Sequence, residues 1–211
     1  MNSIDLNSFV MRFLSRVADI IILSILVLFS CLPIITIGPA LIAGFRVGQN
    51  MAYDTDSGIV FPFFQYFKNN FKQGILCSLF VLAGISMIVL CFLPNSAVPS
   101  PVTTILSTIC YTLIFLYWAV LIYLLSLIAR YNNTLTQHGI NALCLTISNL
   151  LLSVLLVVVA GLPLLTFIIL PDNFFPLIPV WIFFYPGIAL LLISRCLQKT
   201  FAKLESATPS A

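Results

Sequence analysis

Charge is what this sequence has least of. Only 7% of its 211 residues are Asp, Glu, Lys or Arg, against roughly 25% in soluble domains, while 61% are hydrophobic. A chain with so few polar side chains cannot cover a water-exposed surface. Its apolar runs reach the ~20 residues that cross a lipid core. The composition therefore excludes a soluble protein and predicts that the bilayer is its solvent.

Histidine and recognisable catalytic patterns are also scarce. His138 is the only histidine, and the six cysteines show no CxxC spacing and lie, apart from Cys196, inside apolar segments. One histidine cannot build a histidine-based metal site, and cysteines in apolar segments behave as small hydrophobic residues. The spans hold no paired carboxylates, and the chain has no phosphate loop and no nucleophile elbow. We predict no metal, cofactor or disulfide, and no enzymatic activity.

The net charge of +3 does not indicate a nucleic-acid partner. Nearly all nine basic residues lie at the ends of apolar runs, which is where membrane proteins carry their cytoplasmic anchors. Basic groups in this position contact anionic headgroups. Membrane lipids are therefore the predicted partners of these charges.

The apolar runs predict an all-α fold, a polytopic transmembrane helical bundle. Five spans are clear, at residues 18–36, 74–93, 104–129, 147–170 and 175–194. The length fits one compact bundle without an internal linker, so a single integral membrane domain over residues 1–211 is predicted. Tyr185-Pro186-Gly187 should kink the last span, because proline removes a backbone donor inside a helix.

Three amphipathic stretches lead into spans. Residues 6–17 and 63–75 alternate apolar and polar side chains at helical spacing, and residues 134–146 do so more weakly. Such helices lie in the headgroup region, where Lys68 and Lys72 would contact anionic lipid. The alternative is that the helix at residues 63–75 docks a cytoplasmic partner.

The element at residues 39–53 is too short for assignment by length. As a helix its 15 residues rise only ~22 Å, below the ~30 Å of the hydrocarbon core. If all flanking basic residues are cytoplasmic, the chain crosses an even number of times between Arg16 and Lys68. The element then returns to the inside, as a short sixth span or as a re-entrant half-helix packed against protein. Five spans with an external N-terminus is the alternative.

Polar groups at membrane depth are candidate functional residues, because they are costly there. Asp19, near the inner end of the first span, should pair with Arg46 on the returning element, whose long side chain can snorkel toward it. The alternative is that each charge reaches headgroups or water separately. Leu-Pro steps at Pro33, Pro94 and Pro163 leave open whether the chain is an internal duplication or only reuses a helix stop.

One motif resembles a known family. Residues 32–40 read LPIITIGPA and are followed by Phe63-Phe64, Phe67-Lys68 and Asn70-Phe71-Lys72-Gln73-Gly74. This pattern, with the two hydrophobic hairpins after it, resembles the YesL-like family of uncharacterised bacterial membrane proteins. The resemblance implies a bacterial cytoplasmic-membrane protein, whose relatives are encoded beside carbohydrate-uptake transporters and polysaccharide-degrading enzymes.

Two functions are consistent with this resemblance. The first is an accessory or interaction protein of a carbohydrate-uptake system, with ABC-type sugar transporter subunits as candidate partners. The second is a small transporter or permease with its site at the Gly38-Pro39 helix break. The coupling loop of ABC importer permeases has no counterpart in residues 134–149, which favours the first. The candidate structural or functional residues are Asp19, Pro33, Thr36, Gly38, Pro39, Arg46, Lys68, Lys72 and Gly74.

Both termini are predicted to be cytoplasmic, because Arg12 and Arg16 flank the first span and Arg195, Lys199 and Lys203 follow the last. Reporter domains that are active on one side of the membrane, fused to either end of the chain, should both report the inside. An external N-terminus would rule out the even number of crossings and leave the C-terminal assignment standing.

Overall fold

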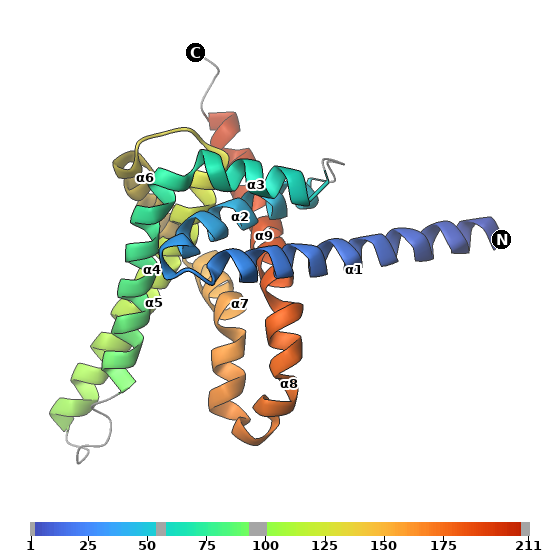
Figure 1. Cartoon of the computed structure of the whole chain (residues 1–211). Coiled ribbons are helices and arrows are strands. Elements are labelled where there is room, and N and C mark those ends of the chain that lie inside the picture. The colour runs from blue at the N-terminus through green and yellow to red at the C-terminus, as the bar shows by residue number, and fades with distance from the viewer. Residues whose placement is uncertain (1–2, 54–57, 93–100, 208–211) are drawn as a thin grey trace.

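The structure is a computed structural model that describes residues 3–53, 58–92 and 101–207, and Figure 1 shows their course. These residues form helices and no strand, which confirms the all-α prediction. The elements are α1 (Ser3–Cys31), η1 (Ile34–Thr36, a 3-10 helix), α2 (Ile37–Ala52), α3 (Val60–Asn69), α4 (Phe71–Phe92), α5 (Pro101–Arg130), α6 (Leu135–Ser148), α7 (Leu150–Ile169), α8 (Pro171–Phe183) and α9 (Tyr185–Ala207).

Within the described ranges, four stretches are long and apolar enough to cross a membrane. They are Val10–Cys31, Phe71–Cys91, Thr103–Arg130 and Leu150–Ile169. Helices α8 and α9 add a fifth if they form one span, which is bent by 63° between them. The kink predicted at Tyr185-Pro186-Gly187 is confirmed, because these residues begin α9 directly after the bend. The helices indicate a multi-pass membrane protein with four or five candidate spans.

The predicted lead-in helices differ in how they join the spans. Helices α3 and α6 are separate elements, and an asparagine ends each of them. The side-chain amide of Asn70 donates to the Tyr66 carbonyl at 3.1 Å, and that of Asn149 donates to the Leu145 carbonyl at 3.3 Å. The first lead-in, in contrast, continues into α1 without a break. Helix α1 ends at Cys31, five residues before the predicted end of the span, because Pro33 follows.

One end of the bundle collects α3, α6 and the C-terminal part of α9, whereas the end of α4, the start of α5 and the α7–α8 connection lie at the opposite end (Figure 1). Helix α4 begins and α5 ends at the first of these ends. We call it the basic end, because the residues near it include Lys68, Lys72, Arg130, Lys199 and Lys203.

The short element predicted at residues 39–53 is α2, and it forms the centre of the molecule. None of its residues is exposed. Helices α1, α3, α4, α5 and α9 all pack on it. A helix that is covered on every side needs small or apolar residues all around. In α2, Gly44 and Gly48 face α9, and Ile42 and Phe45 belong to the hydrophobic core.

The start of α2 crosses α4 with almost no side chain between the two backbones. A Cβ atom on Gly38 would lie 2.0 Å from the Gly74 carbonyl oxygen, and one on Gly74 would lie 2.7 Å from the Pro39 nitrogen. The Gly38 N–H donates to Ser78 Oγ at 2.8 Å, and that hydroxyl lies 2.6 Å from the Ile35 carbonyl oxygen. Ser78 thus satisfies backbone groups that the start of a helix leaves unpaired.

The start of α9 crosses α1 in the same way. The Gly187 N–H donates to Ser24 Oγ at 2.8 Å, and the Ser24 hydroxyl lies 3.2 Å from the Phe184 carbonyl oxygen. A Cβ atom on Gly187 would lie 2.4 Å from the Ile20 carbonyl oxygen. A glycine N–H and a serine from a neighbouring helix therefore define both junctions.

These junctions locate α1 and α2 along the bundle. Ser78 lies seven residues, roughly 10 Å, from the start of α4, and Gly187 lies eight residues, roughly 12 Å, before Arg195 on α9. Figure 1 shows α1 running across the direction of α4, α5, α7 and α9. The far end of α2 returns to the basic end, where Arg130 lies 4.9 Å from the Tyr53 ring centroid. This geometry favours the re-entrant form of the short element over a sixth span.

Gly38→Ala should destabilise the protein by about 1–3 kcal/mol, because the added methyl group meets a backbone oxygen that moves only with α4. The midpoint of thermal unfolding in mild detergent measures this. Gly161→Ala in α7 is the matched control, since a Cβ there meets nothing within 4 Å. It should leave stability unchanged or raise it by about 0.5–1 kcal/mol. Equal midpoints for the two variants would contradict the close crossing.

Candidate functional site

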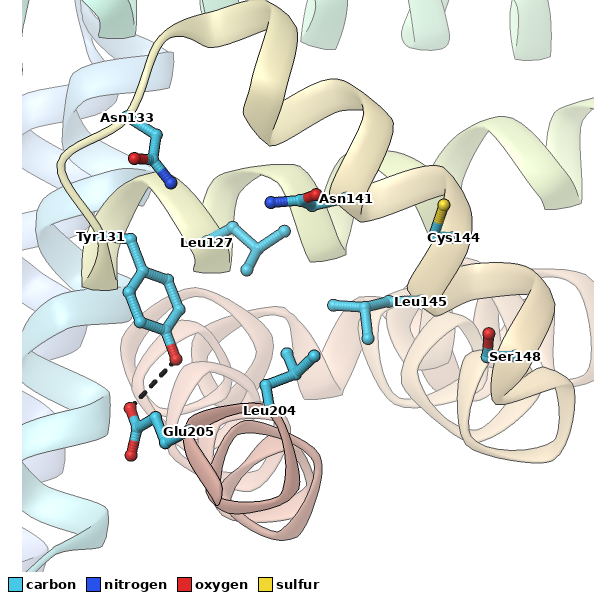
Figure 2. A pocket seen from close by; sticks show the side chains of 9 residues that line it. All are labelled: Leu127, Tyr131, Asn133, Asn141, Cys144, Leu145, Ser148, Leu204 and Glu205. Carbon is cyan, nitrogen blue, oxygen red and sulfur yellow. Dashed lines mark hydrogen bonds between the residues drawn. The ribbon is translucent and has the colours of Figure 1, made fainter. Parts of the chain in front are cut away.

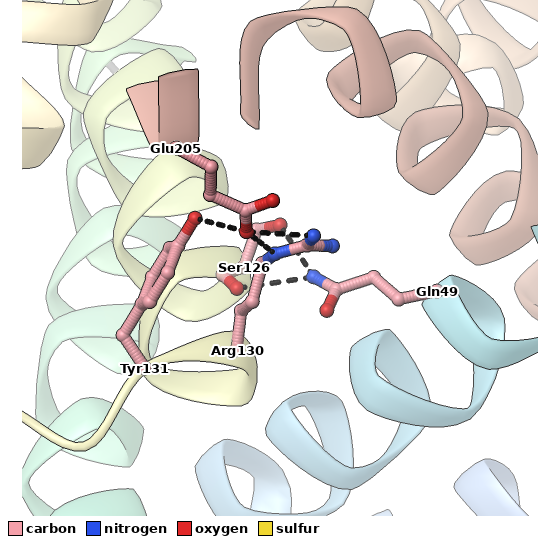
Figure 3. A network of polar contacts seen from close by, with 5 residues as sticks. All are labelled: Gln49, Ser126, Arg130, Tyr131 and Glu205. Atoms are coloured by element: carbon pink, nitrogen blue, oxygen red, sulfur yellow. Dashed lines mark hydrogen bonds and ion pairs between the residues drawn. The ribbon is translucent and has the colours of Figure 1, made fainter. Parts of the chain in front are cut away.

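A polar network joins the ends of α5 and α9 at the basic end. Arg130 donates to Glu205 Oε1 from Nε at 3.0 Å and from Nη2 at 2.8 Å, and the Tyr131 hydroxyl donates to the same oxygen at 3.0 Å (Figure 3). The Arg130 side chain is only 14% exposed, whereas that of Glu205 is 49% exposed. The aromatic rings of Tyr53 and Phe201 cover the guanidinium carbon at 4.9 and 5.2 Å from their centroids. The network fixes Arg130 and leaves the carboxylate accessible.

The network continues into the core through α2. Gln49 is 1% exposed, and its Nε2 donates to the Ser126 carbonyl at 3.1 Å and to Ser126 Oγ at 3.0 Å. Ser126 and Arg130 are one turn apart on α5, so the polar groups follow one face of that helix (Figure 3). Gln49 Oε1 has no hydrogen-bond partner among the described residues. Residues from α2, α5 and α9 are thereby held together by polar contacts.

Beside this network lies a cavity of about 450 Å³ between α5, α6 and α9. Figure 2 shows Tyr131 and Glu205 in one wall and the α6 side chains in the other. Its lining combines amides, hydroxyls, a thiol and a carboxylate with apolar side chains: Leu127, Tyr131, Asn133, Asn141, Cys144, Leu145, Ser148, Leu204 and Glu205. Because Arg130 compensates the charge of Glu205, the cavity suits polar groups without a large net charge.

His138 holds the loop that leads into this cavity. The side chain is fully buried, and its Nε2 accepts a hydrogen bond from the Asn133 N–H at 3.3 Å. Burial lowers the pKa of His138. A hydrogen bond with the backbone of Tyr131 has a smaller, opposite effect, because it favours the charged form. Burial and the Glu205 contact raise the pKa of Tyr131, so its phenol stays a donor. The structure therefore shows His138 as a buried residue that fixes Asn133.

The structure brings three of the predicted candidates together. Gly38, Pro39 and Gly74 meet at the crossing of α2 and α4, where they pack backbone against backbone. Thr36 and Pro33 shape the turn before it, because Thr36 Oγ1 lies 2.7 Å from both the Pro33 and the Ser30 carbonyl oxygens. These five residues form a packing motif, and none of them lines the cavity. Lys68 and Lys72 are exposed on α3 and α4.

The predicted pair of Asp19 and Arg46 is wrong. No ion pair joins them among the described residues; instead the Arg46 guanidinium carbon lies 5.4 Å from the Tyr66 ring centroid. A side-chain hydrogen bond from Arg46 lowers the pKa of Tyr66. It is Arg16 of α1 that reaches α2, donating to the Met51 carbonyl at 3.3 Å. The prediction compared how deep the two residues lie by counting along helices that were assumed to be parallel. It failed because α1 runs across the other helices and because Arg46 contacts Tyr66 of α3.

Sequence reasoning missed the network itself. The sequence predicts Arg130 only as one of the basic anchors at the ends of apolar runs, and no pattern singles out Glu205. One signal was available: Ser126 and Arg130 are polar residues four apart at the end of an apolar helix, which places them on one face. Their partners are distant in the chain: Arg130 and Glu205 are 75 positions apart, and Gln49 and Ser126 are 77 positions apart. Local periodicity cannot identify such contacts.

Among the described residues no three His, Cys, Asp or Glu side chains are grouped to hold a metal ion. The network and the cavity offer hydrogen-bond donors and acceptors instead. The contacts of Arg130 and Tyr131 with the Glu205 carboxylate are both made to one oxygen, Oε1.

The apolar helices indicate that the chain is a multi-pass membrane protein. Residues 20–92 match the model of a family described as a protein of unknown function, DUF624. The match runs from α1 to the end of α4 and includes the Gly38–Gly74 crossing, while the cavity lies outside it. No curated protein and no solved structure matches the chain.

Stability should depend on pH through His138. Because burial lowers the pKa of the folded imidazole, the unfolded chain binds a proton below about pH 6.5 that the folded chain does not. The contribution of neutral His138 is complete above this pH and is lost as the pH falls. His138→Gln keeps an acceptor for Asn133 and does not titrate. The difference in unfolding midpoint between wild type and variant should therefore shrink from about pH 7.5 to about pH 5.5. A difference independent of pH would contradict this.

Proposed function

We propose that this protein is an accessory or interaction subunit of the bacterial cytoplasmic membrane that assists carbohydrate uptake or utilisation, with both termini in the cytoplasm. The resemblance of residues 32–74 to the YesL-like family supports this, and so does the match of residues 20–92 to an uncharacterised family. Its role in this proposal is to bind a partner and not to catalyse a reaction. Subunits of an ABC-type sugar transporter are the candidate partners.

The cavity at the basic end is the observation that favours partner binding. It opens between α6 and the end of α9, which lie at the end of the bundle where surface helices gather (Figure 1). Asn133, Asn141 and Ser148 provide hydrogen-bonding groups beside the apolar Leu127 and Leu145. At about 450 Å³ it falls within the size range of known binding pockets. A docking protein could insert a polar side chain there.

A transporter with its site at the Gly38-Pro39 break is the second candidate that the sequence left open. A substrate at such a break needs free N–H donors and open space. The Gly38 N–H already donates to Ser78, and a single added carbon at Gly38 or Gly74 would meet backbone atoms. The geometry of the break therefore weighs against substrate binding there and favours the accessory role.

Filling the cavity should abolish partner binding. Asn141 is half-buried and lines the cavity, so Asn141→Trp would occupy the space that the partner uses. The full-length tagged protein is purified from its native membranes in mild detergent, and the co-purifying subunits are quantified. We expect at least about a tenfold drop in recovery, which corresponds to ~1.4 kcal/mol or more of binding free energy.

The matched control is Gln137→Trp, which places the same bulk on an exposed position of α6 outside the cavity lining. It should leave recovery unchanged. Replacing both Lys68 and Lys72 by Gln tests the alternative surface: lipid anchoring predicts weaker membrane attachment, by about 1 kcal/mol per charge, with the complex intact. Loss of the partner in the lysine variant alone would move the docking site to α3. A wild-type protein recovered without any partner would refute the accessory role.

A further inference from the structure

Helices α4 and α5 pack in a register that their contacts define. A Cβ atom on Gly84 would lie 2.8 Å from Tyr117 Cε1, and the Tyr117 hydroxyl donates to the Phe80 carbonyl. The two helices run in opposite directions (Figure 1), so seven residues forward on α4 correspond to seven residues back on α5. Seven residues are about two turns, which returns a side chain to the same face. The register therefore brings Cys91 opposite Cys110.

The contacts of the two thiols agree with this register. Cys110 is the neighbouring group that acts on the Cys91 thiol, and both thiols are partly buried and free. A disulfide requires Cα atoms within ~4.4–6.8 Å, a spacing that only a closely packed pair of helices provides. Gly84, two turns from Cys91, lets α4 and α5 approach closely because it has no side chain against Tyr117.

The pair lies away from the basic end. Cys91 is the residue before the last one of α4, and Cys110 lies nine residues, roughly 14 Å, from the start of α5 at Pro101. Arg130 is at the opposite end of α5. With the basic end in the cytoplasm, as the distribution of basic residues predicts, Cys91 and Cys110 lie toward the outer compartment. Disulfides form and persist there.

We propose that Cys91 and Cys110 form a disulfide that ties α4 to α5 in the outer half of the bundle. The oxidant is a disulfide-bearing protein or small disulfide of the outer compartment. One cysteine thiolate attacks the oxidant's disulfide and releases one of its sulfurs, and the second cysteine thiolate attacks the mixed disulfide and releases the other. The two cysteines together lose two electrons and two protons, and the oxidant gains them as two thiols. The absence of CxxC spacing hides this pair from the sequence.

The test counts thiols on the full-length protein from its native membranes. Thiol states are trapped in acid, the chain is denatured, and a maleimide polymer adds a fixed mass to each free thiol. With six cysteines, the wild type should carry four labels as isolated and six after reduction. Cys91→Ser and Cys110→Ser should each carry five labels before and after reduction. The control Cys144→Ser, at an exposed cysteine of the cavity, should carry three and then five.

A second measurement needs no variant. The chain has no Lys or Arg between Lys72 and Arg130, so one tryptic peptide holds both cysteines. After trapping and alkylation of free thiols, this peptide should carry one alkyl group, on Cys77, and should gain two more after reduction. Six labels on the wild type before reduction overturn the proposal. The proposal is also overturned if Cys91→Ser or Cys110→Ser carries two labels fewer before reduction than after it, because another pair would then be bonded. Neither result bears on partner binding, which has its own test.

Discussion

Two serine hydroxyls make this arrangement of helices possible. A helix that begins among apolar side chains has backbone N–H groups without water, and leaving one unsatisfied costs several kcal/mol. Ser78 accepts a hydrogen bond from the Gly38 N–H, and Ser24 accepts one from the Gly187 N–H. Because the donors are glycines, the helices come close enough for these bonds. Helix α2 can therefore start inside the bundle, and α1, α3, α4, α5 and α9 can surround it.

The core and the cavity are coupled through one helix face. Gln49 of the buried α2 bonds Ser126, and one turn later Arg130 bonds Glu205 in the cavity wall. One face of α5 thus carries both the contact to the central helix and a wall of the cavity.

The sequence predicted the helices well, because apolar runs of membrane length and proline breaks act locally. It also selected Gly38, Pro39 and Gly74, which the structure brings together, although it could not show that the reason was close packing. The position of Arg46 was predicted wrongly, because counting residues from a boundary assumes that neighbouring helices run along one axis. The Arg130 and Glu205 contact depends on where α9 ends relative to α5, which no local pattern contains.

The enclosure of α2 has a consequence for biogenesis. Helix α2 is synthesised before α9, which covers Gly44 and Gly48 and follows it far along the chain. Until α9 emerges, one side of α2 has no permanent neighbour. Insertion of this chain therefore cannot finish helix by helix as each leaves the translocon. The packing around Gly44 and Gly48 stays incomplete until α9 closes over them.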